Sequence, residues 1–247
     1  MRRFFGREEN GKIILEKDEF KHLKNVLRLG VGTDVIVSLN DKFEYICNIE
    51  KFEKNYALCK INGKKECPGN PQKKIVLFQA ITKGPKFEFI VQKATEIGVT
   101  KVVPFLSEFC VAKISEHKME RLESIIENAC KQCERTIKTQ VESVKSVDEI
   151  ISCFKDFDIV LFANERVDVG QKLQNLEKYQ NIAIIVGSEG GFSQKEKEKF
   201  IEAGTTSVSL GKRIFRAETA SVAMMSLASI LSGKKYENFD FNFRLQG

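Results

Sequence analysis

The sequence predicts an α/β protein in which a small β-barrel precedes a larger domain of parallel strands and helices. Residues 1–61 contain short apolar segments separated by turn dipeptides, the pattern of a small all-β unit. After residue 71 the pattern changes to apolar runs that alternate with amphipathic helical segments, which is typical of βαβ units. The later apolar runs are continuous, as expected for strands that helices cover on both faces.

The N-terminal segment is expected to form the barrel. Asn10-Gly11, Asn40-Asp41 and Asn62-Gly63 supply the residue types that tight turns need. Strands are predicted at residues 12–15, 34–39, 44–50 and 56–61, and one helix at 18–29. Residues 62–71 combine Pro, Gly and charge without apolar periodicity, so we expect a linker there and domains at 1–70 and 74–247.

The second domain is expected to alternate strands with helices. Strands are predicted at residues 74–80, 99–105, 159–163, 182–186 and 208–210. Helices are predicted at residues 86–97, 115–139, 194–203 and 218–231. Gly98 and Gly204 follow two of these helices, and Ser193 with Glu196 forms a capping box that starts a third.

Charge and composition only mildly favour a polyanionic partner. The 40 basic and 34 acidic residues leave a net charge of +6, a small excess against the total. No secretory signal pattern opens the chain, and no apolar run reaches the roughly 20 residues of a membrane span, so we expect a cytoplasmic protein.

The seven cysteines are expected to be reduced thiols rather than a disulfide framework. Cys130 and Cys133 form a C-x-x-C, but they lie on an apolar helical stripe, which favours buried small side chains over a redox or metal site. The two histidines, His22 and His117, and the lack of a second C-x-x-C argue against a structural zinc ion, so we expect no metal.

The glycine-rich segment 187–191 follows a strand and precedes a capped helix, which is the position of a nucleotide-binding loop. Its spacing matches neither G-x-x-x-x-G-K-[ST] nor G-x-G-x-x-G. Glu189 would also place a negative charge where phosphates would have to sit. The segment therefore favours a cofactor with positive charge, or else it is only a tight turn with a solvated glutamate.

The segment 209–220 resembles the glycine-rich segment 187–191, because it too follows a strand and precedes a helix. Gly211 ends a strand, and Glu218 follows at the start of a helix, where the macrodipole favours a carboxylate. Alone, Glu218 could be a helix-start charge and Arg216 a surface cation. In a parallel sheet, however, ligands bind at the carboxyl ends of adjacent strands, and the strand ends at 164–165, 187–191 and 211 onward all carry polar or glycine residues. These ends predict a ligand site.

These residues resemble those of the bacterial 16S ribosomal RNA (uracil-N3)-methyltransferases, a family of the SPOUT class of S-adenosylmethionine enzymes. The departures from the family pattern are Ser188 for a proline, Phe215 for a leucine and Ala217 for a threonine. The matching pieces are Arg3-Phe4-Phe5, His22-Leu23, Val26-Leu27-Arg28, residues 79–84, residues 92–99, Gln132 with Arg135, residues 187–192 and residues 210–220.

The resemblance implies a PUA-like RNA-binding β-barrel at 1–70 and a SPOUT α/β trefoil-knot methyltransferase domain at 74–247. It implies that the chain after Leu210 threads through a loop to form the knot, and that the protein is a homodimer with residues 218–231 at or near the interface. The expected reaction is methylation of N3 of a uridine in 16S ribosomal RNA, on the small ribosomal subunit.

The resemblance also assigns expected roles to residues, with Arg216 and Glu218 as the catalytic residues. The proton acceptor at N3 stays open. S-adenosyl-L-methionine is expected to contact Phe162, Ala163, Asn164, Val186, Gly187, Glu189, Gly190, Gly191, Leu210, Gly211, Ile214, Phe215, Thr219 and Ala220. RNA is expected to contact Arg2, Arg3, Arg28, Lys83, Lys86 and Arg135.

Two other functions remain open at the level of the sequence. The same fold and cofactor could serve another RNA target, such as a ribose 2′-hydroxyl of transfer RNA. A non-catalytic RNA-binding ribosome-assembly factor is also possible, although the glycines and charged residues of both segments occur together. A nucleotide-hydrolysing enzyme is disfavoured, because a phosphate-binding loop is absent.

Overall fold

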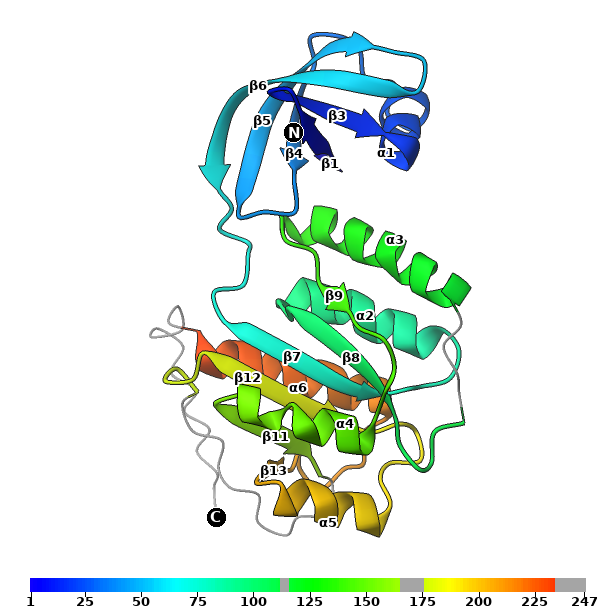
Figure 1. Cartoon of the computed structure of the whole chain (residues 1–247), viewed down its shortest axis with the longest axis vertical. Helices are drawn as coiled ribbons and strands as arrows, with labels where there is room; N and C mark the ends of the chain where they lie inside the picture. The colour runs from blue at the N-terminus through cyan, green and yellow to red at the C-terminus, as the bar shows by residue number, and fades with distance from the viewer. Residues whose placement is uncertain (112–115, 165–175, 234–247) are drawn as a thin grey trace. The chain divides into compact units, whose positions relative to one another are not determined.

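The computed structural model describes residues 1–111, 116–164 and 176–233, which belong to two compact units (Figure 1). Unit 1 comprises Met1–Pro71 and Glu120–Lys138, and unit 2 comprises Gln72–Met119 and Thr139–Gly247. The predicted boundary near residue 70 agrees with the first break. The second segment of unit 1 was not expected, because the predicted domains are consecutive stretches of chain.

Unit 1 contains a curved six-stranded sheet with the order β1-β4-β5-β6-β3-β2 (Figure 1). β1 pairs with β4 in parallel and the other neighbours are antiparallel. The side chains on the inner face form one apolar core, in which Phe4, Leu15 and Val37 are fully buried. The strands are β1 (Arg3–Phe5), β2 (Arg7–Glu9), β3 (Lys12–Glu16), β4 (Asp34–Ser38), β5 (Phe43–Phe52) and β6 (Tyr56–Glu66).

Two elements of unit 1 differ from the sequence predictions. The predicted helix at 18–29 is a short α1 (Lys17–Lys21) followed by a π-helix, η1 (His22–Val26), and Arg28 has a positive φ of 51° that cannot continue a helix. Residues 62–66 of the predicted linker continue β6, and residues 63–66 pair with β5. Their polar pattern reflects exposure of this hairpin end, not the absence of a strand.

Helix α3 (Glu116–Cys133) ends before the predicted residue 139, since Glu134 has a positive φ of 63°. The segment after it is held within unit 1: the side chain of Asn70 accepts from the Thr136 N–H at 3.0 Å, and the Cys67 thiol lies 3.0 Å from the Glu134 carbonyl oxygen. These contacts explain why residues 120–138 group with the barrel. The predicted apolar stripe is confirmed for Leu122, Ile126, Ala129 and Cys130, which are buried, whereas Cys133 is only partly buried.

Unit 2 contains a parallel sheet with the order β10-β8-β7-β12-β11-β13, with β9 paired to β8. Its strands are β7 (Lys74–Ala80), β8 (Lys101–Leu106), β9 (Gln140–Val141), β10 (Lys145–Ser146), β11 (Ile159–Ala163), β12 (Asn181–Val186) and β13 (Thr206–Val208). Its helical segments are α2 (Pro85–Ile97), α4 (Val147–Ser152), the 3₁₀ turn η2 (Phe154–Asp156), α5 (Gln194–Glu202) and α6 (Ala217–Ser232).

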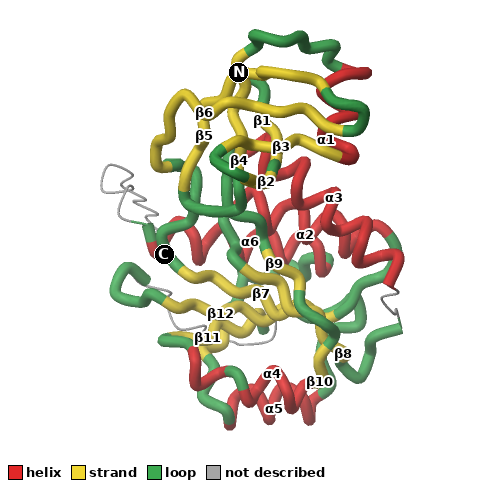
Figure 2. The backbone as a smooth tube through the Cα atoms, turned by 45° about the horizontal axis from the view of Figure 1, so that its top comes forward, coloured by secondary structure: helices red, strands yellow, loops and turns green. Residues whose placement is uncertain are grey.

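The predictions for unit 2 are largely confirmed. The capping box of Ser193 and Glu196 starts α5, and Gly98 ends α2 at a φ of 102°. The sequence analysis missed β9, β10, α4 and η2, which are too short for a periodic pattern to identify. Helices α4 and α5 cover one face of the sheet and α2 and α6 the other (Figure 2), which explains the continuous apolar strands.

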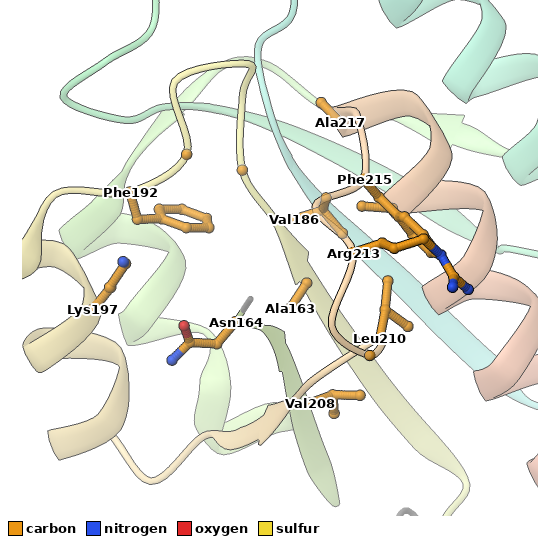
Figure 3. Close-up of a pocket in the computed structure, with 14 residues that line it drawn as sticks. Ala163, Asn164, Val186, Phe192, Lys197, Val208, Leu210, Arg213, Phe215 and Ala217 are labelled. Carbon is orange, nitrogen blue, oxygen red and sulfur yellow. The ribbon is translucent and has the colours of Figure 1, made fainter. Parts of the chain in front are cut away.

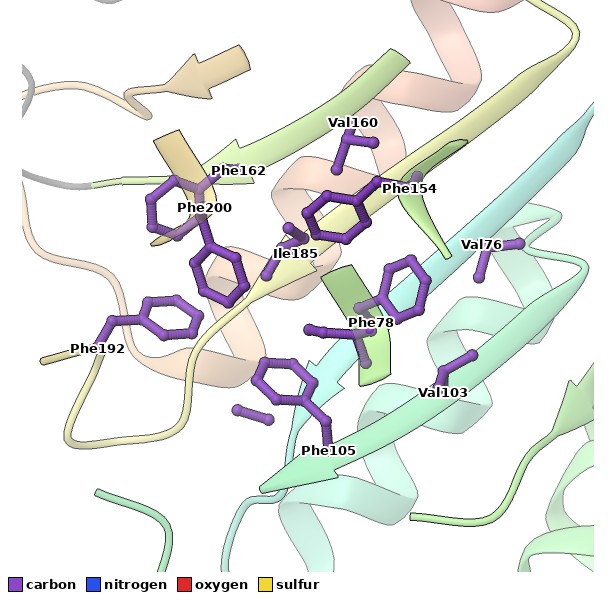
Figure 4. Packing of buried hydrophobic residues seen from close by; sticks show 13 residues of the cluster. Val76, Phe78, Val103, Phe105, Phe154, Val160, Phe162, Ile185, Phe192 and Phe200 are labelled. Atoms are coloured by element: carbon purple, nitrogen blue, oxygen red, sulfur yellow. The ribbon is translucent and has the colours of Figure 1, made fainter. Parts of the chain in front are cut away.

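An aromatic cluster fills the space between the sheet and helices α4 and α5 (Figure 4). Phe192 is stacked on Phe105 at 6.3 Å between ring centroids, and it lies edge-on to Phe162 at 5.2 Å and to Phe200 at 5.4 Å. Close packing of this kind leaves little room for a side chain to move.

In the described ranges, no helix has the length and apolar character that a bilayer crossing requires.

Candidate functional site

A pocket lies where three neighbouring parallel strands end (Figure 3). β11 lies between β12 and β13, so the residues that follow these strands meet at one edge of the sheet. The pocket is lined by Ala163, Asn164, Val186, Gly187, Gly191, Phe192, Lys197, Val208, Leu210, Gly211, Arg213, Phe215, Ala217 and Ala220.

Most of the predicted cofactor residues line this pocket, but their binding role stays a prediction. Glu189, Gly190, Ile214 and Thr219 belong to the same two segments but do not line it. The side chain of Phe162 lies in the aromatic cluster, so only its backbone could serve a ligand. The lining residues among those predicted are Ala163, Asn164, Val186, Gly187, Gly191, Leu210, Gly211, Phe215 and Ala220.

Sequence reasoning missed five lining residues: Phe192, Lys197, Val208, Arg213 and Ala217. Arg213 is exposed and also lines the pocket. For Lys197 a signal was present, because its position one turn after the helix cap Ser193 places it over the strand ends.

Gly187 allows the backbone to pass close to the aromatic cluster. A Cβ at this position would lie 2.9 Å from Cε2 of Phe192 and 3.3 Å from Cα of Gly191. Gly191 has a φ of 66°, and its N–H donates to the Ser188 carbonyl oxygen at 3.0 Å to close the turn. The loop can therefore hold its shape only with glycine at these points.

Gln79 connects the glycine loop to helix α6. Its side chain is fully buried, and Nε2 donates to the carbonyl oxygens of Ala80 at 3.0 Å and Gly187 at 3.2 Å. The hydroxyl of Ser221 lies 2.6 Å from Gln79 Oε1. One buried amide thus positions the ends of β7 and β12 and the first turns of α6 relative to one another.

We expect Gln79→Leu to destabilise the protein by about 1 to 3 kcal/mol, because the Gly187 carbonyl loses a buried donor. The Ser221 hydroxyl loses Gln79 but can still donate to the Ala217 carbonyl oxygen at 2.8 Å. Denaturant unfolding measures the loss. The double variant Gln79→Leu with Ser221→Ala should lose less stability than the sum of the two single variants, because both remove the same Gln79–Ser221 hydrogen bond. Additive losses would contradict the proposed network.

The carboxylate of Glu189 is held at the rim of the pocket. Oε1 accepts from the Lys83 N–H at 3.2 Å and lies 3.2 Å from Lys86 Nζ. Lys86 Nζ also lies 3.7 Å from Oε2 of Glu218, so one ammonium group links the glycine loop to helix α6. Burial raises the pKa of Glu189, but hydrogen bonds from its own N–H, Lys83 and Lys86 outweigh this and leave the pKa below its ordinary value.

The lowered pKa of Glu189 predicts a pH-dependent stability. A carboxylate with a depressed folded pKa contributes stability above its unfolded pKa near 4.5, and this contribution is lost as the pH falls through the folded value. We expect Glu189→Gln to unfold at a lower temperature than wild type at pH 7, and the two midpoints to converge below pH 4. The control Glu202→Gln, at the exposed end of α5, should match wild type throughout. A constant gap for Glu189→Gln down to pH 3 would exclude this linkage.

Arg216 is the N-cap residue of α6 and lies at the pocket rim, between the lining residues Phe215 and Ala217. Its side chain is exposed, and within the described ranges no carboxylate pairs with its guanidinium. Glu218 lies in the first turn of α6 with Oε2 buried. The site thus combines a pocket, an available guanidinium and a held carboxylate at one helix start.

Comparison with known proteins identifies the family. Residues 68–229, which include the whole pocket, match the RNA methyltransferase domain. The chain belongs to this RNA methyltransferase family. Residues 15–62 match the RNA methyltransferase PUA domain, which agrees with the barrel of unit 1.

Curated relatives of this methyltransferase cover almost the whole chain. It is 32% identical over 230 residues to the Ribosomal RNA small subunit methyltransferase E of Mesomycoplasma hyopneumoniae, covering 92% of this chain and 98% of the relative. It is 29% identical over 237 residues to the protein of the same name from Bacillus subtilis, covering 90% and 91%.

Solved structures of related methyltransferases have the same fold. A Ribosomal RNA small subunit methyltransferase E from Neisseria gonorrhoeae, bound to S-adenosyl methionine, aligns with a TM-score of 0.81 at 26% identity over 94% of this chain and 98% of that one. A Legionella pneumophila methyltransferase structure with bound SAM aligns with a TM-score of 0.82 at 28% identity over 92% and 96%. The chain is therefore an α/β methyltransferase with a PUA domain.

The predicted RNA contacts of this methyltransferase divide into two groups. Arg2, Arg28 and Lys83 are exposed, as an RNA contact requires. Arg3 is only 13% exposed and pairs with Glu44 at 2.7 Å and Glu134 at 3.1 Å within unit 1. Arg3 therefore forms structural ion pairs, and its role toward RNA stays a prediction.

Arg135 and Lys86 also differ from the simple expectation of surface cations. Arg135 is 2% exposed, and burial lowers its pKa beside Cys130, Cys133 and Cys67. A side chain buried this deep offers almost no surface to an RNA backbone, and an RNA role for Arg135 stays a prediction that this burial does not support. Lys86 is partly exposed but committed to Glu189 and Glu218, and its role toward RNA stays a prediction.

Proposed function

We propose that this enzyme methylates N3 of a uridine in 16S ribosomal RNA on the small ribosomal subunit, with S-adenosylmethionine as the cofactor. The observation that carries the proposal is the glycine-built pocket at three parallel strand ends, with Arg216, which pairs with no carboxylate among the described residues, at its rim. The names of the curated relatives support ribosomal RNA of the small subunit as the substrate class.

The residues of the pocket fit S-adenosylmethionine. Gly187 and Gly191 let backbone groups approach an adenosine closely, and Val186, Leu210 and Phe215 offer apolar walls for its ring. Lys197 and Arg213 are cations suited to the carboxylate of its methionine part. When bound, the cofactor supplies an electrophilic methyl group on a sulfonium.

Arg216 is proposed to stabilise the uracil as it reacts. N3 of uracil carries a proton and is a poor nucleophile until this proton leaves, and the negative charge then spreads onto the two carbonyl oxygens. A guanidinium at the helix start can donate hydrogen bonds to this developing charge. Positioning can contribute roughly 7 to 11 kcal/mol and proton removal about 10²- to 10⁴-fold, so holding the two reactants together dominates the rate.

Glu218 is the second member of the proposed catalytic pair. Its buried Oε2 has no hydrogen-bond donor within the described residues, and its only close cation there is Lys86 at 3.7 Å. This carboxylate, in the first turn of α6, is the candidate acceptor of the N3 proton.

The finer architecture is part of the same proposal. We propose that the chain after Leu210 forms the trefoil knot of the SPOUT class and that residues 218–231 lie at the interface of a homodimer. The parallel β13 beside β11 and the packing of α6 against α2, β7 and β12 support this arrangement. The scarcity of charge on α6 after Glu218 supports an interface there.

RNA recognition is expected to depend on shape. N3 lies on the pairing edge of the base, so the target must be unpaired or flipped out to reach the pocket. Arg2, Arg28 and Lys83 can contact phosphates, which positions the RNA without reading its sequence. The intact small subunit should therefore be a better substrate than a short uridine-containing oligomer, and equal rates on both would contradict this view.

Nucleoside mass spectrometry tests the target atom. After incubation with small subunits and cofactor, we expect 3-methyluridine as the new nucleoside. A 2′-O-methyl nucleoside would instead support another SPOUT target chemistry. Absence of S-adenosylmethionine binding at millimolar concentration in calorimetry would support a non-catalytic assembly factor.

A further inference from the structure

One exposed aromatic ring lies at the rim of the glycine loop and has no role in the site described so far. Phe109 follows β8 in unit 2 and is 45% exposed, although the nearby Phe105 and Phe192 lie in the core (Figure 4). Within the described ranges, no other ring and no ammonium group contacts it. Phe89, the other strongly exposed phenylalanine of the described residues, has the Lys93 ammonium 5.6 Å from its ring centroid.

The turn that presents Phe109 is anchored on several sides. The Cys110 N–H donates to the Ser107 carbonyl oxygen at 2.9 Å, and the Cys110 thiol lies 3.4 Å from the Ile81 carbonyl oxygen. The Glu108 N–H donates at 2.8 Å to Glu196, the buried carboxylate that caps α5. The ring is therefore held outward by a fixed backbone rather than carried on a free loop.

Phe109 also contacts the glycine loop directly. A Cβ on Gly190 would lie 2.7 Å from the Cβ of Phe109, so the two backbones approach as closely as glycine allows. Gly190 lies between Glu189, which is held by Lys83 and Lys86, and Gly191, which lines the pocket. Phe109 thus packs against the glycine loop between the pocket-lining Gly191 and the residue that Lys83 and Lys86 hold.

We propose that Phe109 is a stacking platform for an unpaired nucleotide next to the target uridine. Single-stranded RNA is recognised by stacking of splayed bases on aromatic side chains, beside cations that contact the phosphates. Phe109 supplies the ring, and the exposed Lys83, whose backbone N–H binds Glu189 in the glycine loop that Phe109 contacts, supplies a cation. The inference rests on the proposed function, because it needs an RNA substrate at this pocket.

Fluorescence provides a direct test, because the chain contains no tryptophan. Phe109→Trp introduces a single indole at the proposed platform, and Ile201→Trp places one at an exposed position on α5 as the matched control. On titration with protein-free 16S ribosomal RNA, we expect quenching of the emission of Phe109→Trp and an unchanged emission of Ile201→Trp. An unchanged emission of Phe109→Trp at RNA concentrations that saturate it in filter binding would overturn the proposal.

Truncation supplies a second readout. Phe109→Ala keeps the Cβ that touches Gly190 and removes only the exposed ring, so the cofactor loop should be unchanged. We expect KM for the small subunit to rise about tenfold or more, with kcat and the calorimetric affinity for S-adenosylmethionine within about twofold of wild type. Ile201→Ala should match wild type. An equal loss of cofactor affinity in Phe109→Ala would assign the ring to loop support and overturn the proposal.

Two outcomes separate this inference from others. If RNA quenches the emission of Phe109→Trp but the wild-type protein forms no 3-methyluridine, the proposed target atom is wrong while the platform stands. If Phe109→Ala changes the mass of the protein in sedimentation equilibrium, the ring belongs to an interface between two copies of the chain, and the nucleotide platform is overturned.

Discussion

Arg216→Ala is expected to lower turnover on the small ribosomal subunit by about a hundredfold or more while changing the affinity for S-adenosylmethionine by no more than a few-fold. The guanidinium lies at the pocket rim rather than in its lining, so its loss should spare the cofactor contacts and remove only the donor for the developing charge on uracil. Single-turnover kinetics and calorimetry measure the two quantities separately.

Arg213→Ala is the matched control, because Arg213 lies in the same segment but lines the pocket. It should weaken the cofactor affinity and leave the single-turnover rate at saturating cofactor close to wild type. If Arg216→Ala retained full turnover, or if the two variants exchanged their effects, the assignment of the guanidinium to the uracil would be wrong.

Gly187→Ala is expected to produce the largest loss of cofactor affinity, about a hundredfold or more. The new Cβ would lie 2.9 Å from Cε2 of Phe192, and this ring cannot yield because Phe105, Phe162 and Phe200 enclose it. The β12 end must then move out of line with the β11 and β13 ends that complete the pocket. Calorimetric titration with S-adenosylmethionine measures the effect.

Gly204→Ala separates this effect from a general loss of stability. Gly204 has a φ of 80° after α5 and open space around its Cβ position, so alanine should cost about 1 kcal/mol in unfolding free energy without reaching the pocket. Its cofactor affinity should equal that of wild type. A Gly187→Ala variant that bound the cofactor normally would show that the loop does not form the site.

The elements that could be predicted are those with a clear local pattern, either a continuous apolar run or a helix cap. β7 and β11 begin and end at the predicted residues, and the capping box of Ser193 and Glu196 placed the start of α5, because local hydrogen bonding alone decides such a helix start. Residues 62–66 were missed as a strand because their stability comes from pairing with β5, which is a tertiary interaction without a local sequence signal.

The candidate site likewise has features that a local sequence pattern predicts and features that depend on tertiary packing. The ends of β11, β12 and β13 could be predicted to meet, since parallel strands end at one edge of the sheet. Burial of single cations could not be predicted: Arg3 and Arg135 have the sequence character of surface residues, and only the packing of residues 120–138 in unit 1 shows them to be structural. Phe109 likewise gave no signal, because its exposure depends on the anchoring of Cys110 and Glu108.

The most direct test of the account is the fate of a labelled methyl group on purified small ribosomal subunits. With wild-type protein and S-adenosylmethionine labelled in its methyl group, we expect the label to approach one methyl per subunit and to be recovered as 3-methyluridine from a single fragment of 16S ribosomal RNA. Arg216→Ala should leave the same fragment almost unlabelled. Label in another nucleoside, or label spread over many fragments, would contradict the proposal that this pocket methylates N3 of one uridine.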